Sequence, residues 1–231
     1  MTDFKLFEEK THITFKNKNL LEQAFTHRSY INENENIKSG HNERLEFLGD
    51  AVLELIITDY LYKEFPSQNE GELTAYRSAI VNAVIISEVA QELGMNDFLL
   101  LSKGEAKDMG KARSYILANT YEAYLGAVYL DRGYDVCVKF VMDSLVPRLK
   151  DIIENKLWRD PKSLVQEKAQ EYAKVTPLYK VMSESGPDHD KHFTVGIFFG
   201  NEQAGLGKGK SKQEAEQSAA RSALEAKNWL E

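Results

Sequence analysis

Apolar residues recur every three or four positions through residues 1–156, which is the spacing of one face of an α-helix. Leu21 and Phe25 show this pattern near the N-terminus, and the strongest apolar run ends at Pro66. Gly94 marks the end of the next run, because glycine favours helix C-termini. We therefore predict an all-helical first part, with helices at 42–64, 71–94, 114–130 and 134–156, a loop at 102–112, and a stop or kink at Pro147.

The pattern changes after residue 156. Phe193, Val195, Ile197 and Phe199 alternate with other residues, so they share one face of a predicted strand. Because the predicted order is α-β-β-β-α, one face of a sheet can be buried under two helices. The predicted elements are a helix at 162–174, strands at 178–185, 192–199 and 202–207, and a helix at 211–227. The predicted organisation is a first domain at 1–156, a linker at 157–161 and a second domain at 162–231.

Three acidic residues share one stripe of the apolar run at 42–64. Glu43, Glu46 and Asp50 are spaced i, i+3 and i+7, within about 60° of one another on a helix. A solvated acidic face would explain this spacing. However, the run is apolar nearly all round, which predicts a buried helix, and buried carboxylates are unfavourable unless paired or metal-bound. Gly49 costs this helix about 1 kcal/mol relative to Ala, which indicates close approach of another backbone.

A second polar pair, Asn119 and Glu122, lies at i and i+3 in the apolar run at 114–130. Facing helices can assemble a metal site from such pairs. All the candidate ligands are oxygen atoms, with no His or Cys, which favours a hard cation such as Mg²⁺ or Mn²⁺ over zinc.

A lysine-rich turn lies at residues 207–212. It is not a nucleotide-binding P-loop, because position 204 holds Ala where that motif needs Gly. Ser211 can cap the following helix, and Lys210 and Lys212 beside free backbone N–H groups would make a phosphate site. A solvated lysine turn explains the same residues equally well.

Charge and composition restrict the function further. The net charge is −7, and all of the acidic excess lies in residues 1–157, which hold 18 Lys+Arg against 25 Asp+Glu. The rest of the chain holds 11 of each. We expect an acidic part that binds cations and a second part that contacts a polyanion. The single cysteine, Cys137, lies among apolar residues and predicts a buried small side chain in a reducing compartment. The N-terminal residues lack the pattern of a signal peptide, and no stretch predicts a membrane span, so we expect a cytoplasmic protein.

Residues 41–53, HNERLEFLGDAVL, resemble the signature segment of ribonuclease III. Residues 162–167 (KSLVQE), 186–189 (GPDH) and 207–220 (GKGKSKQEAEQSAA) resemble the double-stranded RNA-binding domain of bacterial members. The resemblance covers essentially the whole chain in the same order. It implies an all-α nuclease domain followed by a small α+β (α-β-β-β-α) domain that binds double-stranded RNA.

The resemblance also implies the chemistry. It predicts a homodimeric, Mg²⁺-dependent endonuclease, with Mn²⁺ as a substitute, that leaves 5′-phosphate and 3′-hydroxyl ends. Processing of ribosomal, messenger and transfer RNA precursors is the implied role. The implied metal ligands are Glu46, Asp50, Asn119 and Glu122, with Glu43 and Glu70 as further acids near the cleavage site. Phe47 is implied to enter the partner subunit, its alternative being ordinary core, and the implied RNA contacts are Gln166, Glu167, His189, Lys210 and Lys212.

Two departures from the family pattern change the expectation. Asn119 stands where the family usually has Asp, so metal affinity should fall, since an amide oxygen brings no charge. Gln213 stands where the family often has Lys, so RNA binding should be somewhat weaker or less sensitive to salt. Asn119 also favours an alternative, a dimeric RNA-binding protein with a disabled nuclease site. A hydrolase of small molecules is a third hypothesis, but it leaves the second domain unexplained.

Overall fold

A computed structural model of the chain describes residues 2–34, 39–107, 110–156, 158–187 and 190–229. The chain divides into two compact units, Met1–Trp158 and Arg159–Glu231. This division falls inside the segment 157–161 that the sequence marks as a linker.

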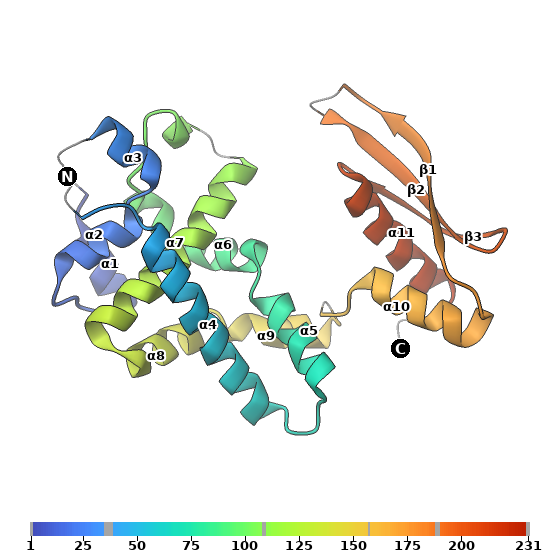
Figure 1. Ribbon diagram of the computed structural model, residues 1–231, viewed down its shortest axis with the longest axis horizontal. Helices are drawn as coiled ribbons and strands as arrows, with labels where there is room; N and C mark the ends of the chain where they lie inside the picture. Colours follow the sequence, from blue (N-terminus) through green and yellow to red (C-terminus); the bar gives the residue numbers. More distant parts are fainter. Residues whose placement is uncertain (1, 35–38, 108–109, 157, 188–189, 230–231) are drawn as a thin grey trace. The chain divides into compact units, whose positions relative to one another are not determined.

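The first unit is built from helices (Figure 1). No single helix among the described residues is long and apolar enough to cross a bilayer, and only α5 and α6 pass that test, when joined across their 46° bend. The helices are α1 (Phe4–Thr11), α2 (Lys18–Phe25), α3 (Arg28–Glu33), α4 (Glu43–Glu64), α5 (Glu70–Ile80), α6 (Ala83–Glu92), α7 (Lys111–Arg132), α8 (Tyr134–Ser144) and α9 (Pro147–Glu154), with short 3₁₀ turns η1 (Met95–Phe98) and η2 (Glu105–Lys107).

The predicted helix at 71–94 is wrong as a single element. The structure ends α5 at Ile80 and starts α6 at Ala83. Asn82, in extended backbone, accepts hydrogen bonds from the N–H groups of Val84 and Ile85, both at 3.1 Å. An asparagine that caps a new helix in this way competes with continuation of the preceding one. The predicted break at Pro147 is confirmed, since this proline begins α9.

Helix α7 runs through the core of the first unit and packs along α4 (Figure 1). Two large side chains of α7, those of Tyr121 and Tyr124, are fully buried. The hydroxyl of Tyr121 lies 2.9 Å from Ser144 Oγ, and that of Tyr124 lies 3.0 Å from Thr11 Oγ1, so both polar groups are satisfied. These contacts hold α7 in one position. The predicted burial of Cys137 is confirmed, and burial raises the pKa of its thiol to about 12.

The prediction that α4 is buried on all sides is wrong for a single chain. Phe47, Leu55 and Tyr62 are 82%, 57% and 73% exposed, although α4 buries its opposite face. Asp50 and Glu43 are exposed as well. Apolar residues on every side of a helix predict that each side is covered. They do not indicate whether the same chain or another molecule covers it.

The second unit is a three-stranded antiparallel sheet in the order β1-β2-β3, with α10 and α11 on one face (Figure 1). The predicted order α-β-β-β-α is confirmed, and so is the buried face of Val195, Ile197 and Phe199. The elements are α10 (Pro161–Lys168), a π-helical turn η3 (Ala169–Ala173), β1 (Leu178–Ser185), β2 (His192–Phe199), β3 (Glu202–Gly209) and α11 (Lys212–Ala226).

Small residues bring α11 close to the sheet. Ala215, Ala219 and Ala223 are fully buried against it, as their helical spacing predicts. A Cβ atom built on Gly207 of β3 would lie 2.1 Å from the backbone nitrogen of Ala219, so a larger residue there would force the two apart. Ser211 caps α11, with its Oγ accepting a hydrogen bond from the N–H of Glu214 at 3.1 Å. The sheet therefore fixes where the lysines beside this cap lie.

Candidate functional site

Two glycines let the backbones of α4 and α7 touch. A Cβ atom built on Gly49 would lie 1.7 Å from the carbonyl oxygen of Glu122, and one built on Gly126 would lie 2.2 Å from that of Leu45. Real Cβ atoms essentially never approach that closely. The close backbone approach predicted from Gly49 is therefore confirmed. It brings Glu46 and Asp50, which flank Gly49 on α4, near Asn119 and Glu122 on α7.

The carboxyl groups of Asp50, Glu46 and Glu122 influence one another across this crossing. The pKa of Glu122 is raised to about 7, first by burial and then by the neighbouring carboxylates of Asp50, Glu46 and Glu54. Among the described residues, none of the groups that shift this pKa is a cation. The Glu122 carboxylate is thus held in an environment that disfavours its charge, which is typical of functional sites.

Asn119 contacts this group of acids directly. Burial raises the pKa of Glu46, and the carboxylates of Glu43 and Asp50 raise it further. A hydrogen bond with the Asn119 side chain acts in the opposite direction and lowers that pKa. The amide at 119 therefore stabilises the charged form of Glu46, which an aspartate in the same place would not do without a cation between them.

The donor set fits a hard divalent cation in its chemistry and charge. Three carboxylates and one amide oxygen are the ligands that Mg²⁺ prefers. A bound cation would offset the burial, and then the repulsion between carboxylates, that raise the pKa values of Glu46 and Glu122. Within the described parts of the chain, no group of three or more His, Cys, Asp or Glu side chains is already arranged to hold a metal ion. The fit therefore rests on residue type and neighbourhood.

The two further predicted acids lie at different places. Glu43 begins α4 and adjoins the group, since its carboxylate shifts the pKa of Glu46. It also forms an ion pair with Arg28 at 3.6 Å, and its Oε2 lies 3.7 Å from His41 Nδ1. Glu70 begins α5, beyond the far end of α4, which is about 27 Å along the helix from Glu46. Within one chain the structure does not bring Glu70 to the other acids.

Glu54 is a neighbour of this group that the sequence analysis did not single out. Its carboxylate helps to raise the pKa of Glu122, and it forms an ion pair with Arg77 of α5, Nε to Oε2, at 3.0 Å. Its position one turn after Asp50 was the available signal, because residues four apart share a helix face. Arg77 balances its charge, so we do not count Glu54 among the candidate ligands.

Phe47 points out of the first unit, which excludes its alternative interpretation as ordinary core. It lies at the edge of a cavity of about 620 Å³. The cavity is also lined by Leu20, Gln23, His41, Glu43, Arg44, Leu45, Leu48 and Leu130. A large exposed aromatic ring beside a cavity that is lined by both leucines and polar residues is typical of a protein–protein contact.

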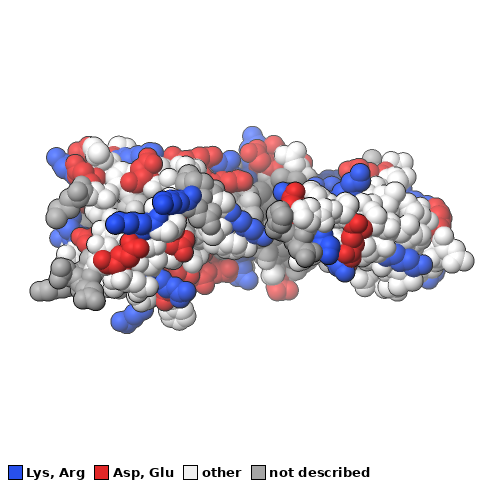
Figure 2. Space-filling view, turned by 90° about the horizontal axis from the view of Figure 1, so that it is seen from above, with Lys and Arg blue, Asp and Glu red and all other residues white. Residues whose placement is uncertain are grey.

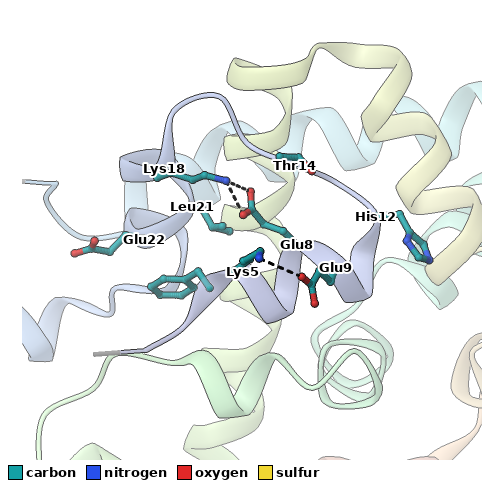
Figure 3. A pocket seen from close by; sticks show the side chains of 9 residues that line it. Lys5, Glu8, Glu9, His12, Thr14, Lys18, Leu21 and Glu22 are labelled. Carbon is teal, nitrogen blue, oxygen red and sulfur yellow. Dashed lines mark hydrogen bonds and ion pairs between the residues drawn. The ribbon is translucent and has the colours of Figure 1, made fainter.

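A second cavity of about 720 Å³ lies between α1 and α2, apart from the acidic group (Figure 3). Glu8 is buried there, and Lys18 Nζ lies 2.5 and 2.6 Å from its two carboxylate oxygens. The backbone N–H of Phe15 also donates to Glu8 Oε1 at 2.6 Å. These bonds tie α1 to the start of α2, so we assign Glu8 a structural role.

The predicted RNA contacts of the second unit lie on its surface. Gln166 and Glu167 are exposed on α10, and Lys210 and Lys212 are exposed at the start of α11. His189 lies outside the described residues. The exposed positions leave the four described side chains accessible to a ligand.

Family models match both units. A model described as "Ribonuclease-III-like" matches residues 17–149, and one described as "Double-stranded RNA binding motif" matches residues 161–227. The first match contains every residue of the α4–α7 group. The second contains the described lysines at the start of α11.

Relatives match almost the full length of the chain. It is 45% identical over 220 residues to Ribonuclease 3 of Borreliella afzelii, covering 95% of this chain and 89% of the relative. It is 43% identical over 224 residues to Ribonuclease 3 of Bdellovibrio bacteriovorus, covering 96% and 95%. A solved nuclease domain of ribonuclease III from Campylobacter jejuni is similar with 37% identity and a TM-score of 0.57, covering 62% of this chain and 96% of that one. That structure is described as flexible in a region involved in dimer formation.

Proposed function

The chain belongs to the ribonuclease III family and is an endoribonuclease that binds and cleaves double-stranded RNA; from this premise we propose that its nuclease centre is the α4–α7 crossing and that it uses Mg²⁺. Cleavage would leave 5′-phosphate and 3′-hydroxyl ends. Precursors of ribosomal, messenger and transfer RNA in the cytoplasm would be its substrates.

One observation carries the proposed centre. Backbone contact at Gly49 and Gly126 places the carboxylates of α4 beside Glu122 of α7, where their charges disfavour one another. We assign Glu46, Asp50, Asn119 and Glu122 as the residues that would hold Mg²⁺, with Mn²⁺ as a substitute. When bound, the cation would lower the pKa of a bound water and polarise the scissile phosphate. Asp50 and Glu122 would orient the attacking water.

Glu43 and Glu70 have a different proposed role. Glu43 adjoins the acidic group in the first turn of α4, which supports a role at the edge of the proposed centre. Glu70 lies at the other end of α4, so we assign it to substrate positioning and not to the same cation.

We also propose that the active form is a homodimer joined through α4. Phe47 of each copy would enter the cavity that lies beside Phe47 of the other copy, so both copies would use the same surface for the contact. The exposed Leu55 and Tyr62 would extend the buried area along the same helix. Such pairing would cover the apolar face of α4 that a single chain leaves exposed.

Double-stranded RNA would be held by the second unit. Gln166, Glu167 and His189 are the proposed minor-groove contacts, and Lys210 and Lys212 the proposed phosphate contacts across the intervening major groove. Both lysines are exposed in the structure, which supports this assignment for the described residues.

We expect Lys212→Ala to weaken duplex binding about 5–10-fold at moderate salt and to leave the cleavage positions unchanged, because a phosphate contact supplies affinity without reading sequence. Fluorescence anisotropy against salt would measure the affinity, and gel mapping the cut sites. Lys227→Ala is the matched control, since Lys227 ends α11 and pairs with Glu202 at 2.9 Å. Equal affinity of the two variants would remove Lys212 from the interface.

Asn119→Asp tests the metal site and the activity together. We expect both forms to cleave a labelled RNA duplex, with the aspartate form reaching half its maximal rate at about tenfold lower Mg²⁺. The reason is that an aspartate adds a fourth negative charge to a group that already repels itself without a cation. The measurement is initial cleavage rate across a Mg²⁺ titration.

The same titration decides the alternative function. If only Asn119→Asp cuts while both forms bind duplex equally, the chain with Asn119 is an RNA-binding protein with a disabled nuclease centre. If the two Mg²⁺ curves superimpose, Asn119 is not a ligand, and the cation is held by the three carboxylates alone.

A further inference from the structure

The lysines proposed to bind RNA phosphates are paired with carboxylates of their own unit. Lys212 Nζ lies 3.4 Å from Glu184 Oε1, and Lys210 Nζ lies 3.5 Å from Asp190 Oδ1. Glu184 lies near the end of β1, and Asp190 lies just before β2. Both acids therefore lie beside the start of α11.

Each of these carboxylates is shared between two basic side chains. Glu184 also lies 3.5 Å from Lys191 Nζ, and Asp190 lies 3.5 Å from His192 Nε2. Glu184 pairs in register with Phe193 on β2, and Lys212 Nζ lies 5.6 Å from the centre of the Phe193 ring. The carboxylate and the ring together hold Lys212 beside the sheet.

A third carboxylate accepts a hydrogen bond from a backbone N–H at the start of α11. The N–H of Lys210, which would be available to an anion, instead donates to Glu214 Oε2 at 2.9 Å. Side chains of both signs also alternate over the face shown in Figure 2, where neither sign forms a continuous patch. At the start of α11, the ammonium groups of Lys210 and Lys212 and the N–H of Lys210 thus already contact carboxylates of the same unit.

We propose that Glu184 and Asp190 are internal competitors of RNA phosphate that limit the affinity of the second unit for duplex RNA. The inference rests on the proposed phosphate contacts of Lys210 and Lys212. The side chains of Glu184 and Asp190 are 39% and 53% exposed, and ion pairs at such positions are weak enough for phosphates to replace. After replacement, each carboxylate remains beside the RNA backbone and repels it.

This arrangement has a measurable consequence for affinity. Removing one carboxylate should tighten duplex binding about threefold, and removing both about tenfold, as expected for a unit charge at this range in water. Because the freed lysines then release more counterions from the RNA, the slope of log affinity against log salt should become steeper by about one for each carboxylate removed. A carboxylate elsewhere on the unit should have neither effect.

The test uses the full chain without divalent metal, so that RNA is bound but not cut. Anisotropy of a labelled RNA duplex would be measured against salt for wild type, Glu184→Gln, Asp190→Asn and the double variant. Glu202→Gln is the matched control, because Glu202 is also an exposed acid paired with a lysine of α11, at its other end. Lys212→Ala is measured in the same series.

Tighter binding and a steeper salt dependence in the double variant, with Glu202→Gln unchanged, would support the proposal. Affinities equal to the control would overturn it, and so would weaker binding in Glu184→Gln, which would mean that Glu184 positions Lys212 for RNA. If the wild-type chain and Lys212→Ala bind duplex RNA with equal affinity, it is instead the proposed phosphate contacts that are wrong.

Discussion

Glu122→Gln is expected to lower duplex cleavage by about 10³-fold, the upper range for removing one group that stabilises charge in a transition state. The substitution keeps the size of the side chain and removes the charge that would hold the cation. Duplex binding should stay within twofold, since the second unit supplies it. Single-turnover cleavage and anisotropy on the same preparation measure the two quantities.

Glu54→Gln is the matched control for this variant. It removes a carboxylate from the same neighbourhood, but one that Arg77 balances. We expect its cleavage rate to remain within a few-fold of wild type. Equal losses in the two variants would show that general negative charge, and not Glu122 itself, supports cleavage.

The thermal stability of metal-free Glu122→Gln distinguishes the loss of a metal ligand from a folding defect. The pKa of Glu122 is about 7 in the folded chain and 4.5 in the reference state, so the folded state binds its proton more tightly. Stability contributed by this group is therefore full below about pH 4.5 and lost as pH rises through 7. The glutamine variant should unfold at a higher temperature than wild type at pH 8 in EDTA. A lower temperature would indicate a packing defect.

Gly49→Ala is expected to destabilise the first unit by about 3 kcal/mol, because the added carbon would overlap the carbonyl oxygen of Glu122. The higher helix propensity of alanine relative to glycine offsets only about 1 kcal/mol of the energetic cost of this overlap. In a unit of this size the net loss should lower the melting temperature by about 6–12 °C. Thermal unfolding followed by circular dichroism measures it.

Cleavage by Gly49→Ala should fall further than its stability explains. To relieve the overlap α4 and α7 must separate, which moves Glu46 and Asp50 away from Glu122, and misplacement by about 1 Å can cost 10²-fold in rate. Gly104→Ala is the control, since a Cβ atom there would meet only Ser102 Oγ, at 3.8 Å. A variant with wild-type stability and activity would contradict the backbone contact.

Much of this protein follows from local patterns in its sequence. Spacing of three and four residues identified α4 and α7, and alternation identified β2, because helices and strands expose one face at a fixed period. The backbone contact at Gly49 was also predictable, since an unfavourable residue inside an apolar helix needs a structural reason. The residue types alone favoured a hard cation as the proposed metal.

Other features depended on contacts between distant segments. The break at Asn82 arose from a capping bond that competes with an apolar period continuing on both sides. The charge of Glu54 acquired its partner, Arg77, only through the packing of α5 against α4, and local spacing contains no information on that arrangement.

The sequence by itself determined the helical and mixed units and the residues that resemble the family, and it indicated the oxygen-bearing residues that we propose as metal ligands. Only the tertiary structure decided that Phe47 faces outward and that the lysines at the start of α11 already have acidic partners. The physical reason is that periodicity follows from the backbone geometry of one element, whereas exposure and ion pairing depend on which elements come together in space. Residues far apart in the chain, such as Glu184 and Lys212, meet only once the sheet and α11 have packed.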